Sequence, residues 1–490
     1  MESDSDIVLN YFFTNPDKPI FSFRCIPQPI QNYIYLGISR FPNVRERFLK
    51  ILTDKNVLEK VADSIKKNQS TDNILKDVTK FAAERNSDVF FNRRHGSSSE
   101  GASIFVVSEQ NPIFATEDQQ DFYYPMTTME FSTRYATRFD IDHVYWDPTL
   151  MKSEFADEIK NTIAKNFEIY KDGFDTIMQI TSKKQNDLSE KVSALDAIRF
   201  IIPLSAYTTI ILGGNVRSVF EHFGKLIAIN DNFMKKYVNE SLKELSKVIP
   251  GFFETIKPDE YKIERNKKLR EYANEIFKGK FKPVKEDVQL FYEMPLEELA
   301  LTQIIYPFCC LPFIEIFDKI SSFNENEKKE LFELANLGRE NRRNPIRGFE
   351  TRHIVFEIET GWALWKDFKR NRMNLRFHQD TRGLAGFDTP EIVKESEIAK
   401  EYENAQKKTS ELVEKVYQKF GGMSRIVGSQ GSRKRYLLCM GPRQLTVLGE
   451  LRTSGEGDKG YRRIASKMIE LAKEKNPRLF GHIKNNFKIL

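Results

Sequence analysis

The chain has 490 residues, of which 40% are hydrophobic and 30% are charged, and its formal net charge is +6. This length allows two to four domains with substantial cores, and the composition is typical of a soluble globular protein. The small net charge does not require nucleic acid as a partner, although it suits anionic ligands.

Hydrophobic periodicity predicts a protein of the α+β class. The stretch 255–287 is dense in Lys and Glu, and we interpret it as a charged connector that is partly helical. In chain order, the pattern predicts helix at 45–82, a strand at 103–108, helices at 154–182 and 215–249, helices at 285–300 and 326–337, a strand at 353–359, and helices at 391–420 and 458–475.

The cysteines and the apolar segments indicate a cytoplasmic protein without a membrane span. Cys25, Cys309, Cys310 and Cys439 form no CxxC pair, so we expect reduced thiols rather than a disulfide framework or a zinc site. The N-terminus is acidic and short of apolar residues, unlike a signal peptide. Residues 200–214 are too short to span a membrane, and we interpret them as buried core.

Three features recur in the same order in the two parts of the chain. "IAKNFE" recurs as "IAKEYE", each at the start of a long helical pattern. Each is followed by an arginine beside an apolar stretch, Arg199 and then Arg425. A tight turn then leads to a second arginine eighteen residues later, Arg217 and then Arg443.

One recurring hexamer is easily produced by chance, whereas a shared order of three features is not. We therefore predict a tandem duplication. Its copies are residues 1–254 and 288–490, called here the first half and the second half, and residues 255–287 connect them.

The segment "MTTMEFSTRYATRF" at 126–139 carries Glu130, Ser132 and Arg134 at alternate positions. In an extended chain these side chains share one face. An exposed strand face is often polar without further function. Arginine and serine also suit phosphate, because they present a planar fork of donors and a small hydroxyl donor.

These residues resemble the signature of flavin-dependent thymidylate synthases, often called ThyX, which is Arg-His-Arg followed by a spaced Glu-x-Ser-x-Arg-Tyr. The first half has "EFSTRY", which adds Tyr135, but "FYY" stands at the position of the triplet. The second half has Arg370, Asn371 and Arg372 at the triplet, and His378, Asp380 and Arg382 at the later positions. The departures from the signature are thus complementary.

Further motifs match the same family. "RHGSSSEG" supplies His95, Ser97 and Glu100 in the manner of a Gly-His-x-Ser-x-x-Glu segment, although a turn-prone loop is an equal alternative. "AIRFIIPLSAYTTIILGGNVRS" resembles the C-terminal family motif and supplies Arg199, Asn215 and Arg217. The family places another arginine nine residues later, where the second half has Arg452.

The resemblance implies two tandem ThyX-like domains, each with a mixed or antiparallel sheet packed with long helices. It implies transfer of a one-carbon unit from methylenetetrahydrofolate to dUMP, with FAD reduced by NADPH. It also implies sites built from more than one subunit of a tetramer, so we expect a homodimer of this chain to form a pseudo-tetramer.

The resemblance assigns roles to individual residues. The catalytic group is Arg134, Arg199 and Arg452, which are expected to neutralise phosphate and polarise uracil. Glu130, Ser132 and Tyr135 complete the substrate site. The expected cofactor residues are Arg370, Asn371, Arg372, Asn215, Arg217, His95, Ser97, Glu100 and Arg443.

Two other interpretations remain open at this stage. Loss of the triplet in both halves favours a non-catalytic relative that binds nucleotide or acts as a scaffold. A nucleic-acid-binding protein is disfavoured, because the charges nearly balance and no basic stripe with interleaved aromatics occurs. No His, Asp or Glu cluster has the spacing of metal ligands, so we expect no metal.

Overall fold

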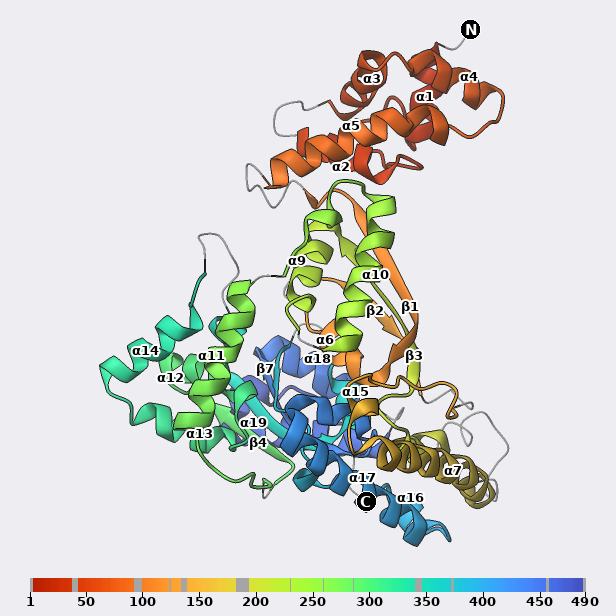
Figure 1. Ribbon diagram of the computed structural model, residues 1–490. Helices are drawn as coiled ribbons and strands as arrows, with labels where there is room; N and C mark the ends of the chain where they lie inside the picture. The colour runs from red at the N-terminus through yellow and green to blue at the C-terminus, as the bar shows by residue number, and fades with distance from the viewer. Residues whose placement is uncertain are drawn as a thin grey trace. The chain divides into compact units, whose positions relative to one another are not determined.

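The structure is a computed structural model with helices and two β-sheets, which confirms the α+β class (Figure 1). It divides into two compact units. The smaller unit contains residues 1–108, 122–129 and 210–259, and the larger contains 109–121, 130–209 and 260–490. The residues described are 3–37, 43–91, 99–122, 125–133, 139–181, 194–229, 231–258, 260–284, 286–339, 346–371, 374–454 and 458–487.

The helices account for most of the regular structure. Those of the first half and the connector are α1 (Asp4–Phe12), α2 (Gln28–Gly37), α3 (Val44–Asp54), α4 (Leu58–Lys66), α5 (Asp72–Phe91), α6 (Thr116–Gln119), α7 (Ala156–Thr181), α9 (Val216–Leu226), α10 (Asn232–Val248) and α11 (Glu260–Ile276). Those of the second half are α12 (Leu296–Ile305), α13 (Phe313–Ser321), α14 (Glu325–Ala335), α15 (Trp362–Phe368), α16 (Glu391–Lys394), α17 (Ala399–Phe420), α18 (Pro442–Arg452), α19 (Lys459–Lys475) and α20 (Pro477–Phe480).

The strands form two sheets with a shared order. β1 (Ser103–Pro112), β2 (Thr127–Glu130) and β3 (Tyr207–Asn215) form a sheet in the order β1-β3-β2. The second sheet has the order β4-β5-β7-β6, and its strands are β4 (Val288–Tyr292), β5 (Ile354–Gly361), β6 (Leu375–His378) and β7 (Arg433–Met440). Its neighbouring strands are all antiparallel.

The order β5-β7-β6 repeats that of β1-β3-β2. A long helix follows the second strand of each trio, α7 in the first half and α17 in the second, and two helices follow the third strand. This common order supports the proposed duplication, although the compact units do not coincide with the two halves.

The long periodic segments form helices where the sequence predicts them, as α7, α14, α17 and α19 show. The apolar stretch 200–214 is core, since Phe200, Ile202 and Leu212 are buried. None of the described helices combines the length and apolar character needed to cross a membrane.

Several local predictions are wrong. The pattern at 45–82 forms three helices, α3, α4 and the start of α5, and that at 215–249 forms two, α9 and α10. Residues 285–300 do not form one helix, because β4 pairs with β5 from Val288↔Ile358 to Tyr292↔Ile354 and Pro295 precedes α12. The polar strand face at 126–139 is also shorter than expected, because β2 ends at Glu130. At 288–292, pairing between strands that are distant in sequence overrides the local pattern.

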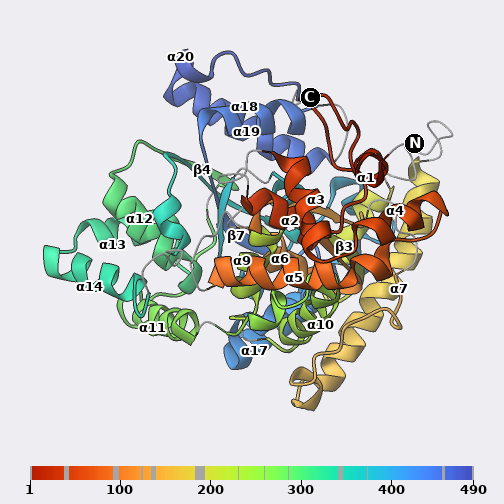
Figure 2. The ribbon, with the colours of Figure 1, turned by 90° about the horizontal axis from the view of Figure 1, so that it is seen from above.

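Helices α1–α5 precede the first sheet, whereas α12–α14 lie between β4 and β5 in the sequence, and the two sets are packed differently. Helices α1–α5 form a core of their own, with residues such as Phe12, Phe48 and Val78. Helices α11–α14 lie together in both views (Figures 1 and 2). Their core includes sheet residues such as Val355 and Leu437. This packing fixes the second sheet, which carries much of the candidate site.

Gly383 tests the close packing beside α17. An added Cβ would overlap the Ser410 carbonyl oxygen and lie 2.9 Å from the Glu414 backbone nitrogen. We expect Gly383→Ala to lower the free energy of unfolding by about 1–3 kcal/mol, as overpacking does. Gly224→Ala is the matched control, because its Cβ meets nothing within 4 Å. It should stabilise helix α9 by about 0.5–1 kcal/mol in the same urea titration. Equal effects of the two substitutions would contradict this packing.

Candidate functional site

Arg199 is the most enclosed of the predicted site residues that the structure describes. It lies at the start of a single 3-10 turn, Arg199–Ile201, and is 2% exposed. Its guanidinium lies 3.5 Å from a carboxylate oxygen of Asp196, 3.3 Å from one of Asp367 and 3.7 Å from one of Asp458. Burial alone would lower the pKa of Arg199, but the three carboxylates raise it. The guanidinium therefore stays charged.

Three carboxylates around one guanidinium leave a surplus of negative charge. This surplus affects the protonation of Asp458. Burial, together with the charges of Asp196 and Asp367, raises the pKa of Asp458 to about 6, although Arg199 opposes the shift. The Asp458 side chain is also the N-cap of α19, where it accepts a hydrogen bond of 2.6 Å from the Gly460 nitrogen. Its protonation therefore changes the charge around Arg199 without requiring the loss of this cap.

Arg199 of the first half and Arg452 of the second half both contact Asp367. Arg452 ends α18 and donates a hydrogen bond of 2.8 Å to the backbone oxygen of Asp367, while Arg199 binds the carboxylate of Asp367. The Arg452 guanidinium carbon also lies 5.3 Å from the centre of the Tyr461 ring. Asp367 is held in place by α15, all of whose residues are buried.

Glu130, expected in the substrate site, lies among lysines of the second half. Its carboxylate is 2.8 Å from Lys366 Nζ and 3.3 Å from Lys369 Nζ, and all three side chains are at most 2% exposed. Gln120 donates a further hydrogen bond of 2.9 Å. Burial would raise the pKa of Glu130, but the two lysines lower it to about 2. Glu130 is thus ionised and enclosed by protein.

Glu117 on α6 has a similar setting. It binds Lys434 of β7, and Arg425 lies 3.8 Å from the same carboxylate. His378, at the end of β6, lies 3.6 Å away, and burial lowers the pKa of this imidazole despite the neighbouring carboxylate. Burial would raise the pKa of Glu117, but the surrounding groups lower it to about 2.

Three of the expected cofactor residues come together in the smaller unit. Asn215 caps α9, its side chain accepting a hydrogen bond of 2.8 Å from the Ser218 nitrogen. Arg217, in the first turn of that helix, forms an ion pair of 2.6 Å with Glu100. Both charged side chains remain partly exposed.

The expected cofactor residues of the second half are more accessible. Arg370 and Arg443 are exposed, and Asn371 is half-buried. Asn371 follows α15, and its backbone nitrogen donates a hydrogen bond of 3.1 Å to the Phe368 oxygen. Arg443 lies in the first turn of α18.

Of the remaining predicted site residues, the structure describes Ser132. Ser132 is half-buried just after β2. Five predicted residues lie outside the described part of the chain: His95, Ser97, Arg134, Tyr135 and Arg372.

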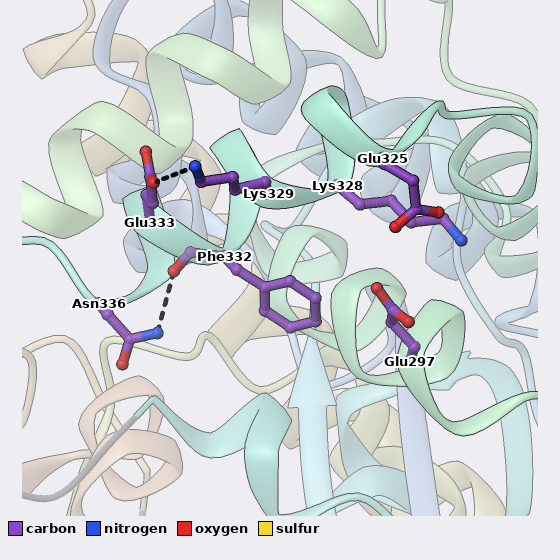
Figure 3. A pocket seen from close by; sticks show the side chains of 7 residues that line it. All are labelled: Glu297, Glu325, Lys328, Lys329, Phe332, Glu333 and Asn336. Carbon is purple, nitrogen blue, oxygen red and sulfur yellow. Dashed lines mark hydrogen bonds and ion pairs between the residues drawn. The ribbon is translucent and has the colours of Figure 1, made fainter.

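A shallow pocket between α12 and α14 does not share this chemistry (Figure 3). It is lined by Glu297, Glu325, Lys328, Lys329, Phe332, Glu333 and Asn336. None of these is a predicted site residue. Lys329 and Glu333 form an exposed pair within α14, so we assign the pocket no part in the site. Among the described residues, no group of three or more potential His, Cys, Asp or Glu metal ligands occurs.

Sequence analysis missed the partners that surround the predicted residues. Asp367, Asp458 and Lys366 are examples, and each is more than 160 residues from the side chain that it binds. A usable signal was present: both halves place charged residues directly after an apolar strand, in "IFATED" and in "GWALWKD".

Comparisons with known proteins support the motifs. Residues 50–251 match the family described as thymidylate synthase complementing protein. A UPF0159 protein of Chlamydia muridarum is 23% identical over 492 residues, which cover 95% of this chain and 91% of its own length. A UPF0159 protein of Chlamydia pneumoniae is 24% identical over 96% of this chain and 92% of its own. One of Thermoplasma acidophilum is 24% identical over 62% of this chain and 61% of its own.

Replacing Asp458 by asparagine tests the charge surplus around Arg199. The folded-state pKa of about 6 exceeds the ordinary 3.8, so the folded protein holds this proton more tightly. Stability is therefore lost as the pH rises from about 4 to above 6. We expect Asp458→Asn, which can still cap α19, to raise the free energy of unfolding by about 3 kcal/mol at pH 8. Near pH 4 it should match the wild type. If urea titrations show the same stability difference between Asp458→Asn and the wild type at every pH, the proposed surplus of negative charge around Arg199 is wrong.

Replacing Glu130 by glutamine tests the buried carboxylate. The substitution leaves Lys366 and Lys369 buried without a counter-charge, and we expect a loss of about 3 kcal/mol in the free energy of unfolding. Glu168→Gln is the control, because Glu168 pairs with Lys165 at an exposed position and should leave stability unchanged. If both substitutions prove neutral in chemical denaturation, the enclosure of Glu130 is wrong.

Proposed function

We propose, since residues 50–251 match the family described as thymidylate synthase complementing protein, that this chain is a FAD-dependent, ThyX-like enzyme. It transfers a one-carbon unit from methylenetetrahydrofolate to dUMP, with NADPH as reductant. The observation that carries the proposal is the meeting of Arg199 and Arg452 at Asp367. This meeting supports a site composed from both halves.

The charges around Asp367 suggest how a uridylate would be held. Uracil is neutral and presents both carbonyl acceptors and an N–H donor, so it suits a guanidinium lying among carboxylates. Arg199 then polarises a uracil carbonyl, and a neighbouring carboxylate accepts the N–H. The phosphate needs cations that are not already paired with a carboxylate, and Arg452 contacts the backbone oxygen of Asp367 rather than its carboxylate. We assign the phosphate to Arg452, Arg134 and Ser132, and we assign Tyr135 and Glu130 to the same substrate site.

The second half offers donors that fit the pyrophosphate of a dinucleotide. Arg370 and Arg443 are exposed, and among the described residues no ion pair within 4.0 Å is recorded for either. Exposed guanidinium groups bind phosphate oxygens in a bidentate manner. We assign Arg370, Asn371, Arg372 and Arg443 to FAD, which supplies redox chemistry when bound.

The remaining assignments follow the family. Asn215, Arg217 and Glu100 are assigned to the adenine side of FAD, with His95 and Ser97 nearby in sequence. The proposed assembly is a homodimer that forms a pseudo-tetramer with half the usual number of sites. The proposed location is the cytoplasm.

A non-catalytic relative is the second candidate, and a specific observation favours it. Arg199 and Glu130 both belong to the ThyX-like motifs, and both already have buried protein partners of opposite charge. Side chains with such partners can hold two halves together without any ligand. The protein would then bind nucleotide weakly or serve as a scaffold.

The visible absorbance spectrum of the purified full-length protein distinguishes the two candidates. We expect flavin near stoichiometry after addition of FAD, and bleaching by NADPH. If the protein retains no flavin absorbance after incubation with saturating FAD and removal of the free cofactor, the enzyme proposal is overturned and the non-catalytic relative is left.

Arginine substitutions test the dUMP site in the same preparation. Arg452→Ala and Arg134→Ala should weaken dUMP binding by roughly 10-fold to 100-fold in calorimetric titration, the value of a hydrogen bond to a charged group. Arg478→Ala is the matched control, because Arg478 is exposed on α20 and has no assigned role. Unchanged dUMP affinity in Arg452→Ala would remove this residue from the site.

A further inference from the structure

Most of the enclosed ion pairs between the two halves have the acid in the first half and the base in the second. We call this arrangement the predominant polarity. In the described part of the larger unit, seven such contacts place the acid in the first half and the base in the second. None of these side chains is more than 20% exposed. The contacts are Glu130 with Lys366 and Lys369, Glu117 with Lys434 and Arg425, Asp118 with Arg425, and Asp121 with Arg347 and Arg376.

The acids belong to two short stretches of the first half. Glu117 and Asp118 lie on α6, Asp121 follows shortly after it, and Glu130 ends β2. The bases come from several elements of the second half, including α15, β6 and β7. An acidic face of one half therefore meets a basic face of the other.

Arg199 is the exception among enclosed contacts. It is a base of the first half that reaches Asp367 and Asp458 of the second. It is also the residue assigned above to uracil, so its reversed polarity is explained by that role. The α7–α17 pairs are about half exposed, which makes their energetic weight small. Lys415–Glu158 and Lys419–Glu154 follow the predominant polarity, whereas Lys165–Glu401 has the opposite one.

Comparable positions of the two halves carry different charges. Glu130 ends β2, whereas His378 ends β6, the corresponding strand of the second sheet. The short helix after β1 supplies Glu117, whereas the short helix after β5 supplies Lys366. If two first halves packed in this manner, Glu130 would meet an acid such as Glu117. If two second halves did, Lys366 would meet His378, which supplies no negative charge.

We propose that this polarity selects the pairing of a first half with a second half and rejects the pairing of like halves. The inference rests on the tandem duplication but not on flavin or nucleotide binding. Burying ion pairs adds little net stability compared with apolar side chains, whereas an unpaired buried charge is strongly destabilising. Such pairs therefore act mainly by penalising the wrong partner. The divergence of the halves thus has a structural role besides any division of the active site.

Charge reversal in the full chain tests the proposal. One variant is Glu130→Lys, which places three cations together. A second is Lys366→Glu with Lys369→Glu, which places three acids together. Each should lower the thermal unfolding midpoint by about 5 °C or more. The variant with all three substitutions restores opposite charges within one chain, and its midpoint should return to within about 2 °C of the wild type.

Mixing supplies the test of partner choice. Denatured Glu130→Lys chains and Lys366→Glu/Lys369→Glu chains are refolded together, with a different tag on each. We expect a mixed complex whose midpoint exceeds that of either variant refolded alone, because each first half now has a matching second half in the other chain. Native mass spectrometry identifies the complex. This rescue does not require either variant to fold by itself.

The matched control reverses the exposed pair Glu158–Lys415, with Glu158→Lys alone and Lys415→Glu alone. Neither should shift the midpoint measurably. The proposal is overturned if the buried reversals also leave the midpoint unchanged. It is equally overturned if the triple variant stays as unstable as its parents, or if mixing gives no mixed complex and no rise in midpoint.

Discussion

The enclosure of Glu130 and Glu117 by cations of the second half is the constraint on which the rest of the larger unit depends. Both carboxylates are buried, and their low pKa values show that the surrounding cations outweigh the penalty of burial. Removing either partner would leave a charge without water or a counter-ion. Segments about 240 to 320 residues apart in sequence must therefore fold together, and this requirement places α15 and Asp367 beside Arg199.

The carboxylates around Arg199 bear on both the stability of the fold and the choice of ligand. Three carboxylates surround Arg199, although one carboxylate is enough to balance the charge of its guanidinium. The surplus negative charge, together with burial, raises the pKa of Asp458. An arginine used only for structure would be satisfied by fewer acids. An arginine used for a phosphate would be poorly served by three. A neutral heterocycle with both donors and acceptors fits this balance better, which is why the proposed function assigns uracil to Arg199.

The two halves share an order of strands but differ in how their sheets are covered. Helices α11–α14 share a core with the second sheet, and every residue of β5 is buried. The helices α1–α5 have a separate core, and β1 alternates between buried and exposed positions over much of its length. Under the proposed duplication, a chain that contains both copies need not keep either surface self-complementary, unlike a symmetric homodimer. The halves were therefore free to acquire opposite charges.

The sequence by itself determined the features that depend on local periodicity and on motif spacing. Long amphipathic segments became α7, α17 and α19, because one apolar stripe must be buried whatever it packs against. The apolar runs of β1 and β5 were recognisable for the same reason, and the spacing of "EFSTRY" and "GGNVRS" was enough to indicate the family.

Only the tertiary structure decided which charges meet. β4 exists because its backbone pairs with β5, about 65 residues later, and no local pattern encodes that pairing. Glu130 looked like part of an open polar face, yet it binds lysines about 240 residues away. The packing of distant elements decides which residue pairs with a buried charge. The sequence next to the charge does not indicate that partner.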